Sequence, residues 1–532
     1  MTGYSTLNPN LPGNMVNRRV RGPKMGGGNA SMMSSNINLL NTIIGAGTLA
    51  MPAAMSHFGV VLGVVLIIWC GLTSAFGLYL QSRCARYLDR GTSSFFALSQ
   101  ITYPNAAVVF DAAIAIKCFG VGVSYMIIIG DLMPGVAEAF GSADAGLEFL
   151  ADRKFWITVF FLVFIIPLSF PKKLDSLKYT SIVALLSIGY LVILVVYHFA
   201  ADEVPNNRNI RIITWEGPIA ALKSLPVIIF AYTCHQNMFS ILNEIKDNTP
   251  LSIVSVIGGS IGSAASVYIL VAITGYLTFG DTVKGNIVGM YPPSIASTIA
   301  KAAIVILVTF SIPLQIHPCR ASIDAVLRWR PGNGSRPQGA GPSASGSQPL
   351  LPSATGPSNG GVLDSHGAPV VAMSELRFAL ITSGILVLSY FTALNVQTLD
   401  TVLAYVGSTG STAISFILPG LFYYKISDPD SIYHQRLSKE DDDAEYSADD
   451  DDEDEAGEAG PSGMLDSVAS LRSNGSAAGG RGRLARWRKK WRWDMEHLET
   501  GLLRKMAMGL SIYGVCVMVV CLTMNALFSA KH

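Results

Sequence analysis

Charged residues are scarce in this sequence. Only 14% of its 532 residues are Asp, Glu, Lys or Arg, whereas half are hydrophobic and the mean hydropathy is +0.41. A soluble globular domain carries about 25% charged residues. The shortage excludes a soluble protein and indicates a polytopic membrane protein that has the lipid bilayer as a partner. The net charge is only +1, and we expect no nucleic-acid partner.

The sequence also lacks the motifs of metal sites and catalytic centres. Its seven cysteines are scattered, mostly within apolar segments, and no CxxC or Cys/His spacing occurs. Neither a disulfide framework nor a zinc site is therefore supported. No P-loop and no nucleophile elbow are present either. We expect a protein that is not an enzyme and that holds neither a metal nor a cofactor.

A cleavable signal peptide is missing as well. The first 30 residues contain no apolar run and are polar, with four basic residues. We expect residues 1–30 to form a disordered cytoplasmic tail, and the first helix to act as the insertion signal. Within the tail, the segment Tyr4 to Leu7 (YSTL) has the form of a tyrosine-based sorting signal, which sorting machinery would bind, although such tetrads also occur by chance.

Apolar runs of membrane-spanning length make up most of the chain. A transmembrane helix needs about 20 predominantly apolar residues. Eleven such runs are found, at 32–56, 59–80, 106–133, 155–170, 180–198, 222–243, 253–279, 294–316, 376–395, 400–424 and 506–528. The predicted fold class is therefore an all-α polytopic membrane protein.

The distribution of Lys and Arg predicts the orientation of these helices. Basic residues concentrate in alternate loops, so the positive-inside rule places the N-terminus in the cytoplasm and the C-terminus on the other side. The expected segments are a tail at 1–30, helices 1–8 at 31–316, a disordered cytoplasmic loop at 317–375, helices 9–10 at 376–424, an acidic then basic cytoplasmic loop at 425–505, and helix 11 with a short non-cytoplasmic C-terminus at 506–532.

The two long loops have distinctive compositions. Residues 331–372 are rich in Gly, Ser and Pro, which is typical of a flexible linker. Residues 441–443 and 449–455 are acidic runs that repel themselves and stay disordered. The basic stretch 483–493 contains three tryptophans, and it fits either an interfacial segment on anionic lipid or an ordinary positive-inside flank.

The first apolar run is interrupted in its middle. It contains Gly45 and Gly47, which weaken a helix, and Pro52, which lacks a backbone donor. Unpaired peptide groups are costly in lipid, so such a break survives only where protein or a water-filled cavity covers it. The break leaves N–H groups that suit a carboxylate and C=O groups that suit a cation. We infer that a small zwitterion binds there.

The sixth run is interrupted in the same way. Pro226 kinks it, and residues 232–237 place six polarisable side chains in mid-span. Broken helices in corresponding positions of two halves indicate a transporter built from inverted repeats, here of five helices each. The two breaks would face each other at the membrane midplane. His235 lies deep in this run, where it either exchanges protons or only packs the break.

Other polar residues within the spans allow more than one interpretation. In the eighth run, the hydroxyls of Thr309 and Ser311 suit a monovalent cation, but they equally suit capping of the backbone groups that Pro313 frees, and helix physics favours capping. In the third run, Lys117 needs a partner or a route to the interface, whereas Asp131 lies near the end, where water reaches it.

Five motifs recur in order within the spans and carry a family resemblance. They are 38–47 (NLLNTIIGAG), 175–181 (DSLKYTS), 230–235 (FAYTCH), 308–313 (VTFSIP) and 417–423 (ILPGLFY). Through them the sequence resembles the amino acid/auxin permease family, in its sodium-coupled neutral amino-acid transporter-like branch and, more closely, in the fungal vacuolar amino-acid transporters. The resemblance covers about residues 30–425 and the last span, and it excludes both long loops.

The resemblance implies a LeuT-like fold with ten helices in two inverted repeats of five, plus an eleventh helix. It implies an amino acid held between the first and sixth helices, with its carboxylate on N–H groups and its ammonium on carbonyl groups. The implied substrate-binding residues are Thr42, Gly45, Ala46, Gly47, Thr48, Phe230, Thr233 and His235, and the implied ion-binding residues are Asn41, Thr309 and Ser311. The coupling ion is either H+ or Na+.

These observations together predict a secondary active amino-acid transporter of an acidic, vacuolar or lysosome-like membrane. We expect ion-coupled export from lumen to cytosol by alternating access. Two alternatives stay open: an amino-acid-sensing receptor that signals through the loops 317–375 and 425–505, and a sodium-coupled importer of the plasma membrane. No fixed charge stands out beside the break, which favours neutral amino acids, but Lys117 and Asp131 leave acidic and basic ones open.

Overall fold

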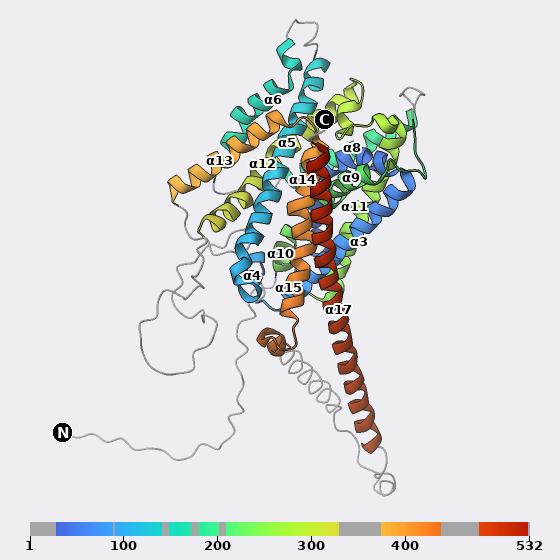
Figure 1. Cartoon of the computed structure of the whole chain (residues 1–532), viewed down its shortest axis with the longest axis vertical. Coiled ribbons are helices and arrows are strands. Elements are labelled where there is room, and N and C mark those ends of the chain that lie inside the picture. The colour runs from blue at the N-terminus through green and yellow to red at the C-terminus, as the bar shows by residue number, and fades with distance from the viewer. Residues whose placement is uncertain are drawn as a thin grey trace, which may run out of the picture.

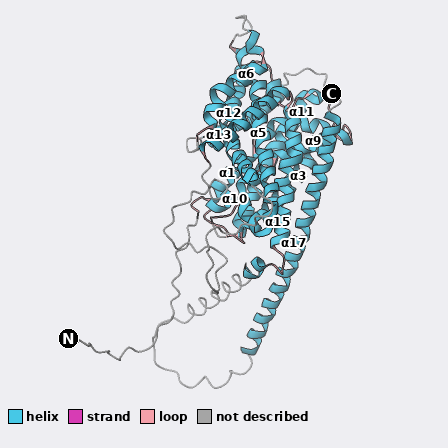
Figure 2. Cartoon of the chain, turned by 60° about the vertical axis from the view of Figure 1, so that its left-hand side comes forward, coloured by secondary structure: helices cyan, strands magenta, loops and turns pink. Residues whose placement is uncertain are grey.

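The computed structural model describes residues 28–88, 91–140, 148–171, 180–201, 209–328, 374–437 and 478–529. Figure 2 shows that this part of the chain is helical, with short connecting loops. The sorting-signal segment at 4–7, the linker 331–372, the acidic runs at 441–443 and 449–455 and most of the motif 175–181 lie outside the described residues.

The first five expected runs all coincide with helices. The first run consists of α1 (Met32–Ile43) and α2 (Ala46–Phe58), and the second is α3 (Val60–Ala85). The short helices α4 (Phe95–Thr102) and η1 (Pro104–Ala106) precede the third, α5 (Ala107–Ala139). After η2 (Glu148–Ala151), the fourth run is formed by α6 (Arg153–Phe160), the π-helix η3 (Phe161–Ile165) and α7 (Ile166–Ser169), and the fifth is α8 (Thr180–Ala201).

The remaining six runs are helical as well. The sixth consists of α9 (Pro218–Ala231) and α10 (His235–Glu244), and the seventh is α11 (Pro250–Phe279). The short helices η5 (Gly280–Thr282) and η6 (Ile287–Met290) lead to the eighth, α12 (Ile295–Arg328), and the ninth is α13 (Glu375–Asn395). The tenth joins α14 (Leu399–Val406), the π-helices η7 (Gly407–Ser411) and η8 (Ala413–Ile417), and α15 (Leu418–Ile426), and the last is α17 (Ala478–Ser529).

Among the described residues, nine helices are long and apolar enough to cross a membrane, and the pair of α1 and α2, bent by 56°, forms a tenth span. The helices also carry large apolar side chains on their outward faces. On α3 these are Val61, Val65, Trp69 and Leu72, each about half exposed and spaced three or four residues apart. Such a stripe suits lipid rather than water. The predicted all-α polytopic fold class is confirmed.

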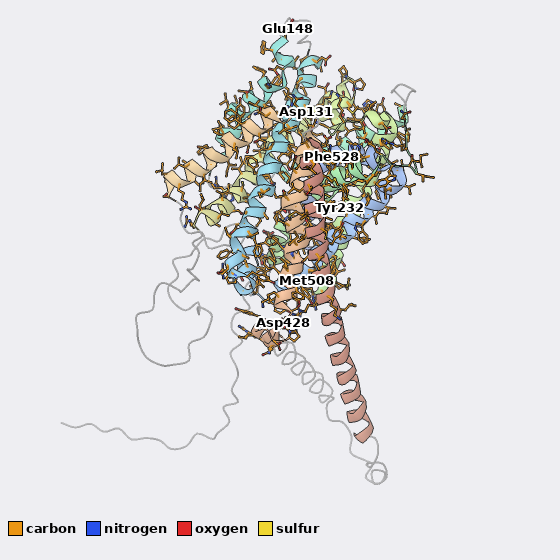
Figure 3. The ribbon with its side chains drawn as sticks, viewed as in Figure 1. Asp131, Glu148, Tyr232, Asp428, Met508 and Phe528 are labelled. Atoms are coloured by element: carbon orange, nitrogen blue, oxygen red, sulfur yellow. The ribbon has the colours of Figure 1, made fainter. Side chains whose placement is uncertain are left out.

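The two interrupted spans lie together at the centre of the bundle. α2 packs against α9 and α11, and α1 packs against α10 and α11. α5 and α12 run along each other beside them (Figure 1). Figure 3 shows Tyr232, at the break of the sixth span, between Phe528 toward one end of the bundle and Met508 toward the other. The breaks therefore lie near mid-depth, as the LeuT-like arrangement requires.

Two helices are longer than the sequence suggested. α12 continues beyond the expected end at 316, through Pro313 and Pro318, to Arg328, so the loop expected at 317–375 begins later. Asp324 accounts for this extension, because Arg328 of the same helix and Arg377 at the start of α13 both pair with its carboxylate. Helix α17 begins at Ala478, inside the loop expected at 425–505, and includes the basic stretch 483–493.

The extra length of α17 is visible in Figure 1, where its first part projects beyond the bundle. No proline lies between 478 and 529, and Leu, Arg and Lys favour helix, so nothing local stops the last span at its expected start. At the other end of the chain, residues 28–30 were expected in the tail. Instead, Ala30 pairs with the segment after α10: its N–H donates to the Glu244 carbonyl and its carbonyl accepts from the Lys246 N–H, both at 2.9 Å.

Candidate functional site

The break of the first span is made by glycine. α1 ends at Ile43 and α2 starts at Ala46, and Gly45 precedes α2 without a side-chain cap. The first N–H groups of α2 therefore have no intrahelical acceptor. Gly47 allows close packing, because a Cβ there would lie 2.5 Å from the Cβ of Ala231 at the end of α9. The two glycines thus open one helix and bring it against the other.

The break of the sixth span is held by α3. Ser74 donates its hydroxyl to the Tyr232 carbonyl at 3.2 Å, and Gln81 donates its side-chain amide to the His235 carbonyl at 2.9 Å. The imidazole of His235 is fully buried, with Nε2 3.2 Å from the Ser74 carbonyl oxygen. A second span therefore bonds two backbone carbonyls at this break, and such support helps a broken helix to persist in lipid.

Two side chains join the breaks to each other. The hydroxyl of Tyr268 on α11 lies 2.7 Å from the Ile43 carbonyl oxygen and 2.8 Å from the Ala231 carbonyl oxygen, so one O–H group serves both interrupted spans. Asn237 on α10 donates its amide to the Thr42 hydroxyl on α1 at 3.0 Å. Asn237 belongs to the polar segment 232–237 that the sequence singled out, but Tyr268 was missed. The available signal was a tyrosine within the apolar run 253–279, whose hydroxyl needs a partner when buried.

A cavity of about 670 Å³ lies at the junction of the breaks. Its size is within the range of small-molecule sites. It is walled by α1, α2, α5, α8, α9, α10 and α12, and it continues past Ser240 and Glu244 of α10 and His317 of α12. Since Glu244 pairs with Ala30, this cavity extends toward the side of the bundle where α1 begins.

Most of the residues predicted for substrate or ion binding line this cavity. They are Asn41, Thr42, Gly45, Ala46, Gly47, Phe230, Thr233 and Ser311. Thr48, His235 and Thr309 do not line it and are buried behind its wall, at 0%, 0% and 4% exposure. The structure therefore brings together the two breaks and one face of the expected ion corner, whereas three of the predicted side chains do not line the cavity.

The expected ion corner has one unpaired oxygen. Asn41 Oδ1 is buried and has no hydrogen-bond partner among the described residues. The hydroxyls of Thr309 and Ser311 donate to the carbonyls of Val305 and Leu307, at 2.6 and 2.8 Å. Neither hydroxyl caps the Thr309 carbonyl, which Pro313 leaves without its helical donor. Both hydroxyls therefore bond backbone carbonyls of their own helix, but not the carbonyl that Pro313 leaves without a donor.

Two charged residues of the third span, Asp131 and Lys117, lie in different surroundings. Asp131 pairs with Arg153, whose Nε lies 3.0 Å from Oδ1, and Figure 3 shows it near the end of the bundle toward Glu148. Lys117, in contrast, lines the cavity and is 4% exposed. Tyr125, two turns further along α5, also lines it, and its hydroxyl lies 3.9 Å from where a Cβ at Gly45 would stand.

A second cavity, of about 600 Å³, lies on the far side of the packed breaks. Its wall includes His57, Glu216, Lys223, Asp400 and Phe528. His57 Nδ1 is 2.5 Å from Glu216 Oε2, which ties the end of α2 to the loop before α9. Between the two cavities the helices pack closely; a Cβ at Gly407 would lie 2.0 Å from the Pro226 carbonyl oxygen.

Comparison with known proteins identifies the family. The family model described as transmembrane amino acid transporter protein matches residues 28–441, which is well over half of the chain. The chain belongs to this family. The predicted resemblance is thereby confirmed, and the described bundle with its two interrupted helices is this family member's fold.

Relatives include fungal vacuolar proteins. Vacuolar amino acid transporter 6 of Saccharomyces cerevisiae is 43% identical over 410 residues, which cover 75% of this chain and 90% of that protein. Vacuolar amino acid transporter 5 of Schizosaccharomyces pombe is 42% identical over 401 residues, covering 75% and 86%. Sodium-coupled neutral amino acid transporter 7 of Bos taurus is 28% identical over 316 residues, covering 58% and 67%. These names agree with the prediction that the chain is not an enzyme.

Similar solved structures include MhsT in complex with L-phenylalanine, at 13% sequence identity and a TM-score of 0.45, covering 77% of this chain and 95% of that chain. A Na+-coupled sialic acid symporter in a substrate-bound outward-open state has 13% identity and a TM-score of 0.41, with coverage of 75% and 79%.

Proposed function

We propose that this protein is a secondary active transporter of amino acids in the membrane of an acidic, vacuole-like organelle. The observation that carries the proposal is the cavity at the junction of two interrupted helices. At one place it offers the free N–H groups of a helix start, and at another the carbonyl groups of a helix end. A small zwitterion has the complementary pair of charges.

The roles of the lining residues follow from this polarity. The substrate carboxylate would accept hydrogen bonds from the N–H groups of Ala46 and Gly47, at the positive end of α2. The substrate ammonium would donate to carbonyl oxygens near Phe230 and Thr233, where α9 ends. Tyr125, whose hydroxyl faces Gly45, is placed to donate a further hydrogen bond to the carboxylate.

Alternating access supplies the transport step. The substrate cavity extends toward the side where α1 begins, and the second cavity lies beyond the packed breaks. Rocking α1, α2, α9 and α10 against the remaining helices would close the first and open a path from the second. An ion drives this cycle only if it binds one conformation better than the other. Asn41 Oδ1 and the Thr309 carbonyl are the ligands that we propose for it.

The direction and the coupling ion are further parts of the proposal. The relatives named as vacuolar transporters favour an acidified organelle. With the N-terminus in the cytoplasm, the substrate cavity of this conformation faces the cytosol. The proton gradient of such an organelle points outward from the lumen, so proton symport would export amino acids from lumen to cytosol.

Reconstitution into lipid vesicles tests these statements. Vesicles loaded with a mixture of labelled amino acids are diluted into buffer with an imposed proton gradient, with a sodium gradient, or with neither, and efflux is followed. We expect efflux that the proton gradient accelerates and that sodium leaves unchanged. If only the sodium gradient accelerates efflux, sodium and not the proton is the coupling ion. If neither gradient changes efflux, transport is not coupled to either ion. Absence of amino-acid movement in all three arms would overturn the transport function.

A further inference from the structure

Lys117 is a buried lysine whose amino group has no hydrogen-bond partner among the described residues. It sits in the middle of α5, is 4% exposed and lines the substrate cavity. Among the described residues, no carboxylate, carbonyl or hydroxyl bonds to its ammonium. A charge at this depth of a membrane protein is costly unless it is paired, and an intramembrane ionisable residue is by default a functional one.

Other buried basic side chains in the bundle bond to protein groups. Lys301 of α12 is 5% exposed, and its Nζ donates to the Tyr291 carbonyl at 3.2 Å. Arg153 pairs with Asp131, and Arg320 donates to the Thr382 hydroxyl at 3.2 Å. None of these three lines the substrate cavity. Lys117 therefore differs from these three residues in two ways: it faces the cavity, and it has no partner in the part of the chain that the structure describes.

The charges around the cavity define what Lys117 can bind. The ionisable side chains of its described wall are Lys117, Cys118, Tyr125, Glu244 and His317. The single carboxylate among them, Glu244, stands at the end of α10, away from the breaks. The deep part of the cavity thus carries a cation and no described carboxylate. A ligand with one negative charge beyond its own zwitterion would complete the site.

Lys117 is placed to contact the side chain of a bound amino acid, as distinct from its α-carboxylate and α-ammonium groups. Lys117, Val121 and Tyr125 follow each other at four-residue spacing, so they share one face of α5. Tyr125 is at the carboxylate-binding break beside Gly45, and Lys117 is two turns away from it on the same wall. Gly410 lets the tenth span approach Lys117, because a Cβ there would lie 2.8 Å from Lys117 Cβ. Lys117 is therefore held by packing at a distance from the α-carboxylate position.

We propose that Lys117 selects amino acids with acidic side chains, by pairing its ammonium with the side-chain carboxylate. This inference rests on the proposed transport function and narrows its substrate class. It also revises the expectation of neutral substrates, because the side chain that the sequence left undecided proves to face the cavity. Lysine and arginine substrates would be repelled, and neutral ones would leave the Lys117 ammonium buried and unpaired.

Glutamate and glutamine provide the cleanest test, because they are nearly isosteric and differ in charge. Efflux of each from vesicles containing the wild-type protein should favour glutamate by at least about tenfold. Equal efflux of both amino acids, or preference for glutamine, would overturn the role of Lys117 while leaving amino-acid transport intact. If neither glutamate nor glutamine nor any other amino acid moves, the proposed function itself fails.

Variants at the two buried lysines then locate the effect. Lys117→Met keeps the length of the side chain and removes its charge, so the glutamate-to-glutamine ratio should fall to about one or below. Lys117→Arg keeps the charge, and glutamate should stay preferred even if the rate falls. Lys301→Met is the matched control: it removes a lysine that is equally buried but outside the cavity, and it should leave the ratio unchanged. A wild-type ratio in Lys117→Met, or a lost ratio in Lys301→Met, would contradict the assignment.

The main alternative to substrate selection is that Lys117 carries the transported proton. In that case Lys117→Met would slow glutamate and glutamine alike and would abolish the response to the proton gradient. That result overturns charge selection, provided that thermal unfolding of the purified variant shows a folded protein. Should Lys117→Met fail to fold, thermal stabilisation of the wild-type protein by glutamate and not by glutamine gives an independent reading of the same selectivity.

Discussion

The two interrupted helices of this bundle differ in what surrounds their breaks. The break between α1 and α2 opens onto the cavity, and no side chain of the described residues caps the start of α2. The break between α9 and α10 is partly satisfied from behind, by Ser74 and Gln81 of α3. The first break is therefore the more receptive to a ligand, and the second is the better supported framework. Tyr268 and the pair of Asn237 and Thr42 couple one to the other.

The largest effect is expected when a bulky side chain is placed in the interruption between α1 and α2. In Gly47→Leu the side chain would overlap Ala231, since a Cβ alone comes within 2.5 Å of the Ala231 Cβ. We expect transport to fall by about a hundredfold or more, and the free energy of unfolding to fall by about 1–3 kcal/mol. Vesicle efflux and thermal unfolding measure the two effects.

The matched control for this substitution is Gly262→Leu on α11. Gly262 is exposed on the outside of the bundle, and a Cβ there meets no atom within 4 Å. This variant should keep wild-type transport and stability. Substantial transport by Gly47→Leu would mean that the contact between the two breaks is not needed for the cycle.

The next largest effect is expected at the hydroxyl that serves both breaks. Tyr268→Phe leaves the buried carbonyls of Ile43 and Ala231 without this donor, which should cost about 1–3 kcal/mol of stability. Transport should fall by about tenfold, because the relative position of the breaks loosens. Tyr190→Phe is the control, since its hydroxyl donates to the Ala296 carbonyl at 3.1 Å, away from the breaks. Equal transport losses in both variants would show that the effect is not specific to the breaks.

A smaller effect is expected from the side-chain link between the breaks. Asn237→Ala and Thr42→Val each remove one end of the 3.0 Å hydrogen bond between α10 and α1. Thermal or denaturant unfolding of the two single variants and the double variant should give a coupling energy of about 0.5–1.5 kcal/mol. Strictly additive effects would show that this link contributes nothing to holding the breaks together.

The smallest effect is expected at His235, and it decides between the two roles that the sequence left open for this residue, proton exchange and packing of the break. His235 is fully buried behind the cavity wall, where its Nε2 faces the Ser74 carbonyl. We expect His235→Gln to lower stability by about 1 kcal/mol without shifting the pH dependence of transport between about pH 5 and 8. A profile displaced along the pH axis would restore the imidazole as a proton carrier.

Sequence reasoning reached the fold through local chemistry. The apolar runs, Gly45 with Gly47, and the polar segment around Cys234 each carry their information within about 25 residues, which is the length of one span. The ends of α12 and α17 were missed because they depend on more than hydropathy. α12 is extended by ion pairs between Asp324 and arginines on two helices, and α17 continues because its basic stretch is also a good helix former.

The residues of the candidate site were predicted less completely than the fold, because the sequence does not show which face of each helix turns toward the cavity. The sequence names the residues near a break but not the direction in which each side chain points. Gly45, Gly47 and Phe230 line the cavity, whereas Thr48, His235 and Thr309 are buried away from it. Tyr268 was missed because its partners, Ile43 and Ala231, are 225 and 37 residues away.

The sequence by itself determined that this chain crosses a membrane many times and that its first and sixth spans are broken, because hydropathy and backbone flexibility are properties of short segments. Only the tertiary structure decided which polar groups meet at the breaks. It paired Asp131 with Arg153 and left Lys117 facing the cavity, although both acid and base stand in the same helix. Burial and pairing depend on contacts between distant segments, and those contacts exist only once the helices have packed.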